Sequence, residues 1–205
     1  MLTLFYAPGS CSDASRIALE EAGASYQALR VDLSKEEQRQ PQYLAINPKG
    51  RVPALVTDEG VITETVAILG WIAQAFPEAR LAPDDAFGFA RAQAFNAYLA
   101  TTVHVAYAHW RRAYRWADDA ACRQHLRDRA PERYADCFEV IEKEMLEGPW
   151  VLGDDFSICD AYLFVMADWL ETVDIDPSRF PRVHEHRERV RARPAVRKVL
   201  AQQAA

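Results

Sequence analysis

The sequence lacks the features that mark several common classes of protein. Its 205 residues contain four cysteines, and no two of them form a Cys-x-x-Cys pair or a zinc-binding spacing. Basic residues are outnumbered, 24 against 30 acidic ones, which gives a net charge of −6 at pH 7. That charge argues against nucleic acid as the main partner, because phosphate binding needs a basic face.

Long apolar runs are also missing. No run approaches the roughly 20 residues that a membrane span needs, and no secretion-type leader precedes the Pro8-Gly9 turn. These absences lead us to expect a cytoplasmic protein with neither a membrane segment nor a metal site.

The cysteines and histidines are scattered and show no metal-binding or disulfide spacing, but one cysteine differs from the others in its position. We expect Cys122, Cys137 and Cys159 to lie on apolar helix faces as small, inert hydrophobic residues. His184-x-His186 falls in a charged helical segment and is predicted to be solvated surface. Only Cys11 stands at a turn.

That turn separates the first predicted strand from the first predicted helix. The apolar run Met1–Tyr6 breaks at Pro8-Gly9, and helix-spaced apolar residues follow over 13–22. Tyr6, Ser10 and Cys11 therefore lie between strand end and helix start. The N–H groups of a helix N-terminus carry about half a unit of positive charge, which favours a thiolate there.

The next segments suggest a βαβ unit around a partly parallel sheet. A second strand is predicted over 26–33 and a short helical segment over 43–46. Asn47-Pro48-Lys49-Gly50 has the residue preferences of a type I β-turn. A strand over 51–56 opens on a proline, and the Val52-Pro53 bond is a candidate for the cis form.

A hairpin turn and a helix complete the first part. Asp58-Glu59-Gly60 predicts the hairpin, and a helix starting at Thr63-Glu64-Thr65 runs to Ala75. The proline-bounded break over 77–85 is the best domain boundary, so we expect domains at 1–78 and 85–205.

The second part is predicted to be helical throughout. A long aromatic helix is expected over 86–116, and Asp118 could cap the next helix, in which Pro131 either makes a kink or starts a fresh helix. Ser157-x-x-Asp160 has the pattern of a capping box before a buried helix. Pro181 and Pro194 start two further helices.

Five motifs in this order resemble the cytosolic glutathione transferases, and their bacterial beta class above all. The motifs are Tyr6-x-x-Pro8-Gly9-Ser10-Cys11-Ser12, Leu44-Ala45-Ile46-Asn47-Pro48-Lys49-Gly50-x-Val52-Pro53, Thr63-Glu64-x-Val66-Ala67-Ile68, Val103-His104 and Asp160-Ala161-Tyr162-Leu163-Phe164. The similarity covers nearly the whole chain. Val105 and Ala97 depart from the pattern, at positions where the family has a lysine and an asparagine.

The resemblance implies an α/β thioredoxin-like N-terminal domain, an all-α C-terminal domain that contributes a co-substrate pocket, and a homodimer. It makes glutathione the co-substrate, with no metal. By position it assigns catalysis to Cys11, Ser10, Tyr6 and His104, and glutathione binding to Lys35, Val52, Pro53, Glu64 and Thr65.

Structural alternatives remain for several of these residues. Cys11 could be only a small helix-start residue and Tyr6 a core aromatic, while Thr63 and Glu64 could be an N-cap and a dipole-favoured acid. Asp160 is expected to be structural.

Three functions follow from the resemblance. The first is transfer of glutathione to hydrophobic electrophiles in detoxification, with thiol–disulfide exchange or peroxidase activity through Cys11. The others are a non-enzymatic ligand-binding regulator and a glutathione-dependent isomerase or dehalogenase.

Overall fold

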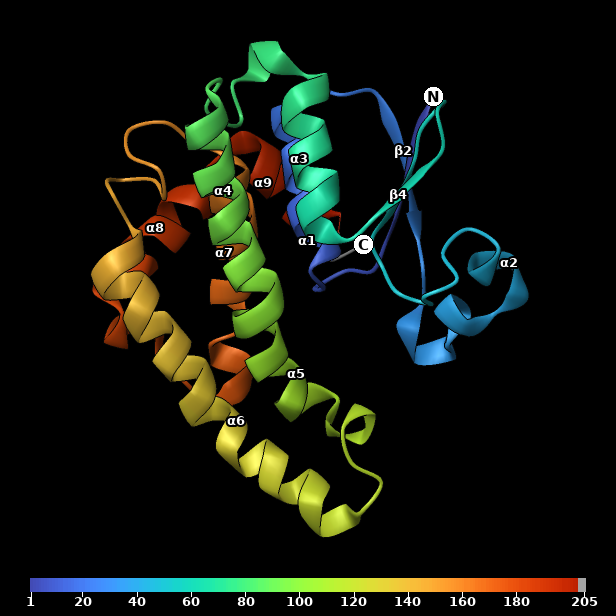
Figure 1. Cartoon of the computed structure of the whole chain (residues 1–205), viewed down its shortest axis with the longest axis vertical. Helices are drawn as coiled ribbons and strands as arrows, with labels where there is room; N and C mark the ends of the chain where they lie inside the picture. Colours follow the sequence, from blue (N-terminus) through green and yellow to red (C-terminus); the bar gives the residue numbers. More distant parts are fainter. Residues whose placement is uncertain (203–205) are drawn as a thin grey trace. The chain divides into compact units, whose positions relative to one another are not determined.

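The computed structural model describes residues 1–202, which divide into two compact units (Figure 1). Unit 1 is Met1–Ala90 together with the segment that starts at Arg191, and unit 2 is Arg91–Val190. The division falls a few residues after the predicted break over 77–85. The C-terminal segment also joins the first unit, whereas the sequence assigned it to the second domain. No helix in residues 1–202 is long and apolar enough to cross a membrane.

Unit 1 is built on a mixed four-stranded sheet with the order β2-β1-β3-β4. The strands are β1 (Leu2–Tyr6), β2 (Tyr26–Arg30), β3 (Ala54–Val56) and β4 (Val61–Thr63). β1 pairs with β2 in parallel, with Leu2 opposite Tyr26, and pairs with β3 antiparallel, with Leu4 opposite Leu55. A parallel neighbour requires a crossover, and the helix over residues 12–21 supplies it.

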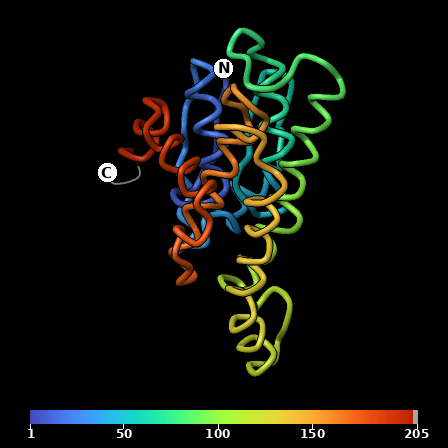
Figure 2. The backbone as a smooth tube through the Cα atoms, turned by 90° about the vertical axis from the view of Figure 1, so that its left-hand side faces the viewer, coloured from blue at the N-terminus to red at the C-terminus, as the bar shows by residue number. Residues whose placement is uncertain are grey.

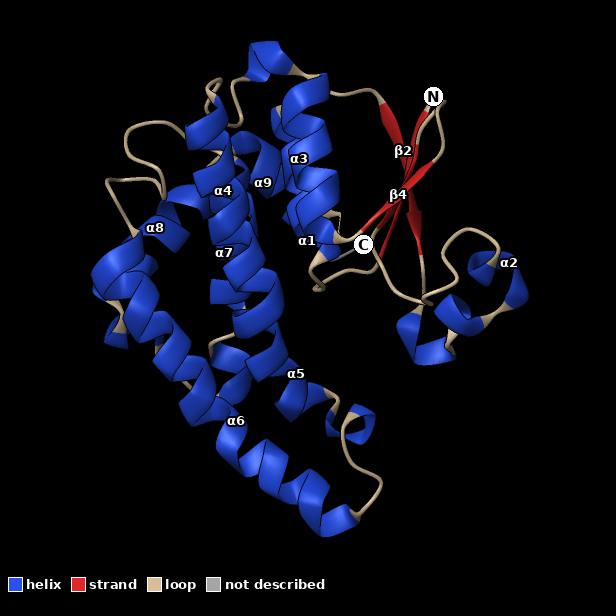
Figure 3. Cartoon of the chain, in the orientation of Figure 1, coloured by secondary structure: helices blue, strands red, loops and turns tan. Residues whose placement is uncertain are grey.

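Three helices accompany the sheet. They are α1 (Ser12–Glu21), α2 (Pro41–Leu44) and α3 (Thr65–Ala75), with α1 and α3 on one side and α2 on the other (Figure 3). Leu4 of β1, Ile17 of α1 and Ile68 of α3 are fully buried between the sheet and this helix pair. The predicted α/β thioredoxin-like fold of this part is confirmed.

The turns predicted for unit 1 are present. The Gly50 N–H donates to the Asn47 carbonyl at 2.9 Å, which closes the β-turn over 47–50, and the Thr57 N–H donates to the Gly60 carbonyl at 2.8 Å in the β3–β4 hairpin. The Val52-Pro53 peptide bond is cis. β3 starts after this proline and not before it, because a proline cannot donate to the ladder.

The regular secondary structure of unit 2 is helical, apart from an isolated β-bridge between Trp150 and Gly153 in the loop before residue 158. Its helices are α4 (Ala86–Tyr98), which spans the division, α5 (His104–Arg111), α6 (Ala120–Val140), α7 (Ile158–Asp168) and α8 (Pro181–Arg191). α5 and α6 run side by side (Figure 2). The predicted all-α class of this part is confirmed.

Several boundaries in unit 2 differ from the prediction. The expected continuous helix over 86–116 is interrupted by a π-helical turn, Leu99–Val103, and its α-helical part ends at Arg111. Asp119, and not Asp118, caps α6 by accepting the Cys122 N–H at 2.9 Å. Pro131 lies inside α6, which continues through it.

The helix α7 forms the core of unit 2, and the predicted capping box starts it. The Asp160 carboxylate accepts the Ser157 N–H at 2.7 Å and the Val151 N–H at 2.8 Å. His186 Nε2 also bonds to this carboxylate at 2.7 Å. The prediction that His186 is solvated was wrong: the residue is only 1% exposed, because its ring turns inward to a buried acceptor. The prediction for Cys122 was also wrong, since it is exposed.

The last helix, α9 (Pro194–Ala201), lies beside α1 (Figures 1 and 2). Val196 and Val199 of α9 are fully buried. Arg193, just before α9, pairs with Glu21 through two contacts of 2.6 and 2.7 Å, and Lys198 pairs with Glu20 at 2.7 Å. These apolar and ionic contacts explain why the end of the chain belongs to unit 1.

Candidate functional site

The loop over residues 7–11 connects β1 to α1, and its conformation depends on one glycine. Gly9 has φ = +69°, a left-handed conformation that side chains with a Cβ rarely adopt. Cys11 then takes the N-cap position of α1 and is partly exposed, without capping the helix through its own side chain. The predicted strand–loop–helix arrangement around Tyr6, Ser10 and Cys11 is therefore present.

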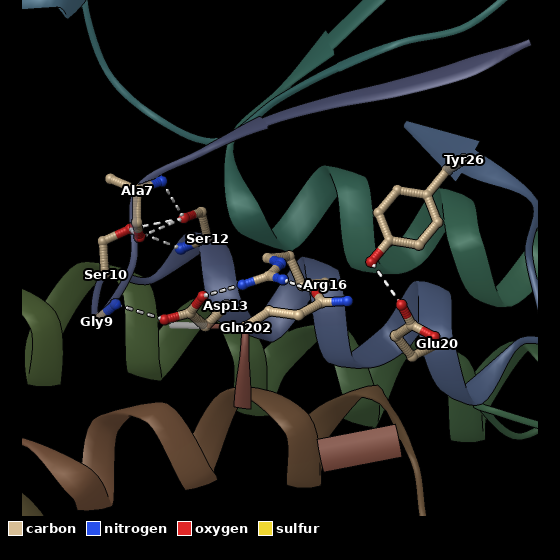
Figure 4. A network of polar contacts seen from close by, with 9 residues as sticks. All are labelled: Ala7, Gly9, Ser10, Ser12, Asp13, Arg16, Glu20, Tyr26 and Gln202. Carbon is tan, nitrogen blue, oxygen red and sulfur yellow. Dashed lines mark hydrogen bonds and ion pairs between the residues drawn. The ribbon is translucent and has the colours of Figure 1, made fainter. Parts of the chain in front are cut away.

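Two serines hold this loop closed (Figure 4). The Ala7 N–H donates to Ser12 Oγ at 3.0 Å, and the Ser10 hydroxyl donates to the Ala7 carbonyl at 2.8 Å. The two hydroxyl oxygens lie within hydrogen-bonding distance, 2.6 Å. The Ser10 hydroxyl is thus used within the loop in this conformation.

The first amides of α1 are also engaged by Ser10. The Ser12 N–H donates to Ser10 Oγ at 3.2 Å, and the Asp13 N–H donates to the Ser10 carbonyl at 3.0 Å. These two N–H groups are therefore already hydrogen-bonded. A ligand sulfur at the N-terminus of α1 would be stabilised by the positive end of the helix dipole, and this stabilisation does not require a free N–H group.

Cys11 and Val52, 41 residues apart in sequence, meet in the structure. The Cys11 thiol donates to the Val52 carbonyl with a separation of 3.7 Å between sulfur and oxygen. Val52 precedes the cis Pro53 at the entry to β3. The loop that carries the thiol and the segment with the cis proline thus lie next to each other.

Two buried side chains hold the backbone just before Val52 in place by hydrogen bonds to the Arg51 carbonyl. The Tyr43 hydroxyl and the Asn47 amide both donate to the Arg51 carbonyl at 2.6 Å. Burial raises the pKa of Tyr43 to about 12, which keeps its hydroxyl protonated as a donor.

Glu64 holds an uncommon backbone conformation at the start of α3. Its φ of +75° lies in a region that is rare for residues with a Cβ, and such a conformation often indicates a functional position. Its side chain does not cap α3. Instead, the exposed carboxylate forms an ion pair with Lys49, whose ammonium group also donates to Thr63 Oγ1 at 2.7 Å.

Thr65 is the first residue of α3 and is buried. With Glu64 beside it, a carboxylate and the N-terminal end of a helix lie next to each other. This arrangement suits a ligand group that carries an ammonium and a carboxylate on one carbon.

Lys35 lies on a short 3-10 turn, Leu33–Lys35. Its exposed ammonium group is 3.4 Å from the Asp32 carboxylate. The Ser34 hydroxyl and N–H donate to that carboxylate and lower the pKa of Asp32 to about 2.

Tyr6 is a buried aromatic residue of the core, with 8% of its surface exposed. The guanidinium carbon of Arg16 lies 4.1 Å from the centre of the Tyr6 ring. The backbone carbonyl of Tyr6 accepts the Val31 N–H at 2.7 Å. Its hydroxyl donates to no group in residues 1–202, so it stays available to a ligand.

His104 is the one predicted residue that lies in unit 2. It starts α5 directly after the π-helical turn, and its ring meets Trp169 edge to face with 5.0 Å between the centroids. Trp169 stacks on Tyr107 at 4.3 Å. His104 therefore belongs to an aromatic cluster.

Sequence reasoning missed three charged residues of unit 1. Lys49 was interpreted only as part of a turn, although it reaches the Glu64 carboxylate. Asp13 and Arg16 of α1 are both buried, and Asp13 accepts the Gly9 N–H at 2.7 Å (Figure 4). The signal for this pair was present: their i, i+3 spacing is that of a helical ion pair, on a helix with a buried face.

No group of three or more histidine, cysteine, aspartate or glutamate residues in the described chain could hold a metal ion.

Known proteins resemble both halves of this chain. The family model for the N-terminal domain of glutathione S-transferases matches residues 1–74, and the C-terminal domain model matches residues 124–189. The glutathione S-transferase GstA of Escherichia coli O157:H7 is 30% identical, over 98% of both chains.

Solved structures agree with this match. A glutathione transferase homolog from Sulfitobacter, with bound glutathione, superposes with a TM-score of 0.95 at 42% identity over 98% of both chains. A bacterial beta-class glutathione S-transferase from Sphingomonas chungbukensis gives a TM-score of 0.85 at 33% identity, also over 98% of both chains.

Proposed function

This chain belongs to the glutathione S-transferase family, and from that membership we propose that it binds glutathione, stabilises its thiolate and transfers it to electrophilic small molecules. The contact between the Cys11 thiol and the Val52 carbonyl carries this proposal, because it joins the loop that favours a thiolate to the segment that leads into β3. A peptide bound along Val52 would have its sulfur next to Cys11.

We assign the γ-glutamyl end of glutathione to Glu64 and Thr65. The ligand ammonium pairs with the Glu64 carboxylate in place of Lys49, and its carboxylate lies at the start of α3. The uncommon backbone conformation of Glu64 supports this assignment. Val52 pairs its backbone with the cysteinyl unit beside Pro53, and Lys35 takes the glycyl carboxylate.

The chemistry requires a lowered thiol pKa. A free thiol with a pKa of about 8.5 is only a few per cent ionised at neutral pH, and lowering the pKa by two units corresponds to about 2.7 kcal/mol. We assign this stabilisation to the field of α1 and to hydroxyl donors. Tyr6 is an available donor, whereas Ser10 must first release the Ala7 carbonyl.

The thiolate then attacks an electrophilic carbon, and the leaving group departs with the bonding electron pair. With a disulfide substrate, the Cys11 thiolate attacks one sulfur of glutathione disulfide, forms a mixed disulfide and releases one glutathione. Cys11 therefore adds thiol–disulfide exchange to conjugation. For peroxidase activity, the Cys11 thiolate takes one oxygen of the peroxide and becomes a sulfenic acid, while the O–O bond breaks and an alcohol or water leaves. One glutathione then forms the mixed disulfide with loss of water, and a second glutathione reduces it to release glutathione disulfide.

The remaining roles follow from the family alone. We propose a homodimer in the cytoplasm that acts in detoxification on hydrophobic electrophiles, with His104 facing the co-substrate. Size-exclusion chromatography with light scattering tests the homodimer.

Mass spectrometry tests the function directly. After incubation with glutathione disulfide, the protein is expected to carry one glutathione on Cys11, which a reductant removes. The protein is also expected to bind immobilised glutathione and to conjugate it to 1-chloro-2,4-dinitrobenzene. Cys11→Ala abolishes the adduct, whereas the matched variant Cys122→Ala, which removes the exposed cysteine, keeps it.

Two results would contradict the proposal. Failure to bind glutathione would remove the function altogether. Binding without turnover of haloarenes, disulfides or peroxides would favour a non-enzymatic ligand-binding protein.

A further inference from the structure

The carboxylate of Asp13 does something unusual for an acidic residue at the start of a helix. Its Oδ2 accepts the N–H of Gly9, four residues earlier, at 2.7 Å, so it bonds to the loop before the helix (Figure 4). Asp119 provides the contrast: it is exposed and accepts the Cys122 N–H of its own helix.

The burial of Asp13 requires a counter-charge. Asp13 is 4% exposed, and a buried carboxylate is strongly disfavoured unless a cation compensates it. Arg16, which is 1% exposed, supplies that cation: its Nη1 lies 3.6 Å from Asp13 Oδ1.

Arg16 is in turn held by two distant parts of unit 1. Its guanidinium carbon lies 4.1 Å from the centre of the Tyr6 ring, and its Nη2 donates to the side-chain carbonyl of Gln202 (Figure 4). Gln202 directly follows α9. A chain of contacts therefore runs from the C-terminal helix through Arg16 and Asp13 to Gly9.

We propose that Asp13 is a positioning residue for the loop of Ser10 and Cys11, with its charge compensated by Arg16 and its geometry supported from α9. Gly9 needs its left-handed conformation to direct the chain into α1. The Asp13 carboxylate stabilises that conformation by accepting the Gly9 N–H. Asp13 therefore affects the sulfur of bound glutathione only through the conformation of this loop.

Amide hydrogen exchange tests the proposal without any ligand. Labelling with ¹⁵N-glycine gives eight glycine amides to resolve, among them that of Gly9. In Asp13→Ala the Gly9 amide should exchange about tenfold faster than in the wild type, because its acceptor is gone. Unchanged exchange at Gly9 would overturn the proposal.

Asp13→Ala alone leaves the buried Arg16 without its counter-charge, so two double variants that also replace Arg16 separate this effect from the loss of the hydrogen-bond acceptor. In Asp13→Asn/Arg16→Gln the amide oxygen can still accept the Gly9 N–H, whereas Asp13→Ala/Arg16→Gln offers no acceptor. Neither variant keeps the buried ion pair, so a difference between them reports the acceptor alone. Slow Gly9 exchange in the first and fast exchange in the second support the proposal, and equal exchange refutes it.

The second readout is the thiol of bound glutathione, and it rests on the proposed function. Its ultraviolet thiolate absorbance, titrated against pH, should give a higher apparent pKa in Asp13→Ala/Arg16→Gln than in Asp13→Asn/Arg16→Gln. The control Asp119→Ala should lower the melting temperature without moving this pKa, and an equal movement in the control would contradict a positioning role.

The two hypotheses fail in different ways. If the wild type does not bind glutathione, the proposed function fails and Gly9 exchange still decides the role of Asp13. If glutathione binds with a lowered thiol pKa but the variants match the wild type in both readouts, only the role of Asp13 is refuted.

Discussion

Glu64 combines two features that are rarely found together: a left-handed backbone and a carboxylate that pairs with a lysine from another turn. An exposed ion pair contributes only about 0–1 kcal/mol, so stability alone does not account for a conformation that costs about 1–3 kcal/mol. The proposed binding of a ligand ammonium group by Glu64 offers a functional reason for this conformation.

The variant Glu64→Gln tests this argument. We expect the KM for glutathione to rise about tenfold, because a hydrogen bond to a charged group is worth about 1.5–3 kcal/mol. Steady-state kinetics with varied glutathione measure it.

The matched control is Glu139→Gln, which removes an exposed carboxylate that pairs with Lys143 and Arg179 in unit 2. It should leave the KM unchanged. Equal KM values for Glu64→Gln and the wild type would remove Glu64 from the binding site.

At the scale of elements, α2 and the turn after it fix the backbone that leads into β3. The Tyr43 hydroxyl donates to the Arg51 carbonyl from the buried side of this segment. Burial raises the pKa of Tyr43 to about 12, so the folded state favours the neutral phenol. The resulting stabilisation is complete below the unfolded value of about 10 and is lost as the pH rises toward 12.

Tyr43→Phe should therefore reduce the free energy of unfolding by about 1 kcal/mol near pH 8. It should also weaken the fall in stability between pH 10 and pH 12. Urea denaturation at a series of pH values measures both effects. Tyr114→Phe, at a position 57% exposed, is the control. An identical alkaline profile in Tyr43→Phe and the wild type would show that this phenol does not titrate with unfolding.

Local signals explain which elements were predicted correctly. The turn over 47–50, the capping box at Ser157 and Asp160 and the strand–loop–helix around Cys11 are each encoded within a few neighbouring residues. The π-helical turn at Leu99–Val103 has no such signal, because its residues fit an α-helix equally well.

Long-range partners could not be predicted. His186 looked like a surface residue because its neighbours are charged, yet it bonds to Asp160, 26 residues earlier. Arg16 and Gln202 are 186 residues apart. In the candidate site, family motifs predicted the residues. The pairing of Glu64 with Lys49 and the hydrogen bond from the Ser10 hydroxyl to the Ala7 carbonyl depend on how the chain folds.

At the scale of the whole molecule, the first unit contains both ends of the described chain. α9 covers α1 with Val196 and Val199, which are fully buried, and adds the ion pairs of Arg193 and Lys198. The unit that carries the candidate glutathione site therefore depends on residues from the far end of the sequence.

Val199→Ala should destabilise unit 1 by about 2 kcal/mol, since it removes buried methyl groups and leaves a cavity. Hydrogen exchange with mass spectrometry should show faster exchange in α1 than in α7. The exposed substitution Lys198→Ala breaks one ion pair and should have a smaller effect. Faster exchange confined to α7 would show that α9 stabilises the other unit.

The pairing of α9 with α1 has a consequence for synthesis. A ribosome makes the chain from its N-terminus, so every residue of unit 2 has been translated before α9 appears. The four strands and α1 are translated before unit 2 but obtain the contacts of α9 only after unit 2 has been translated. Unit 1 therefore begins before unit 2 in the order of synthesis and is completed after it.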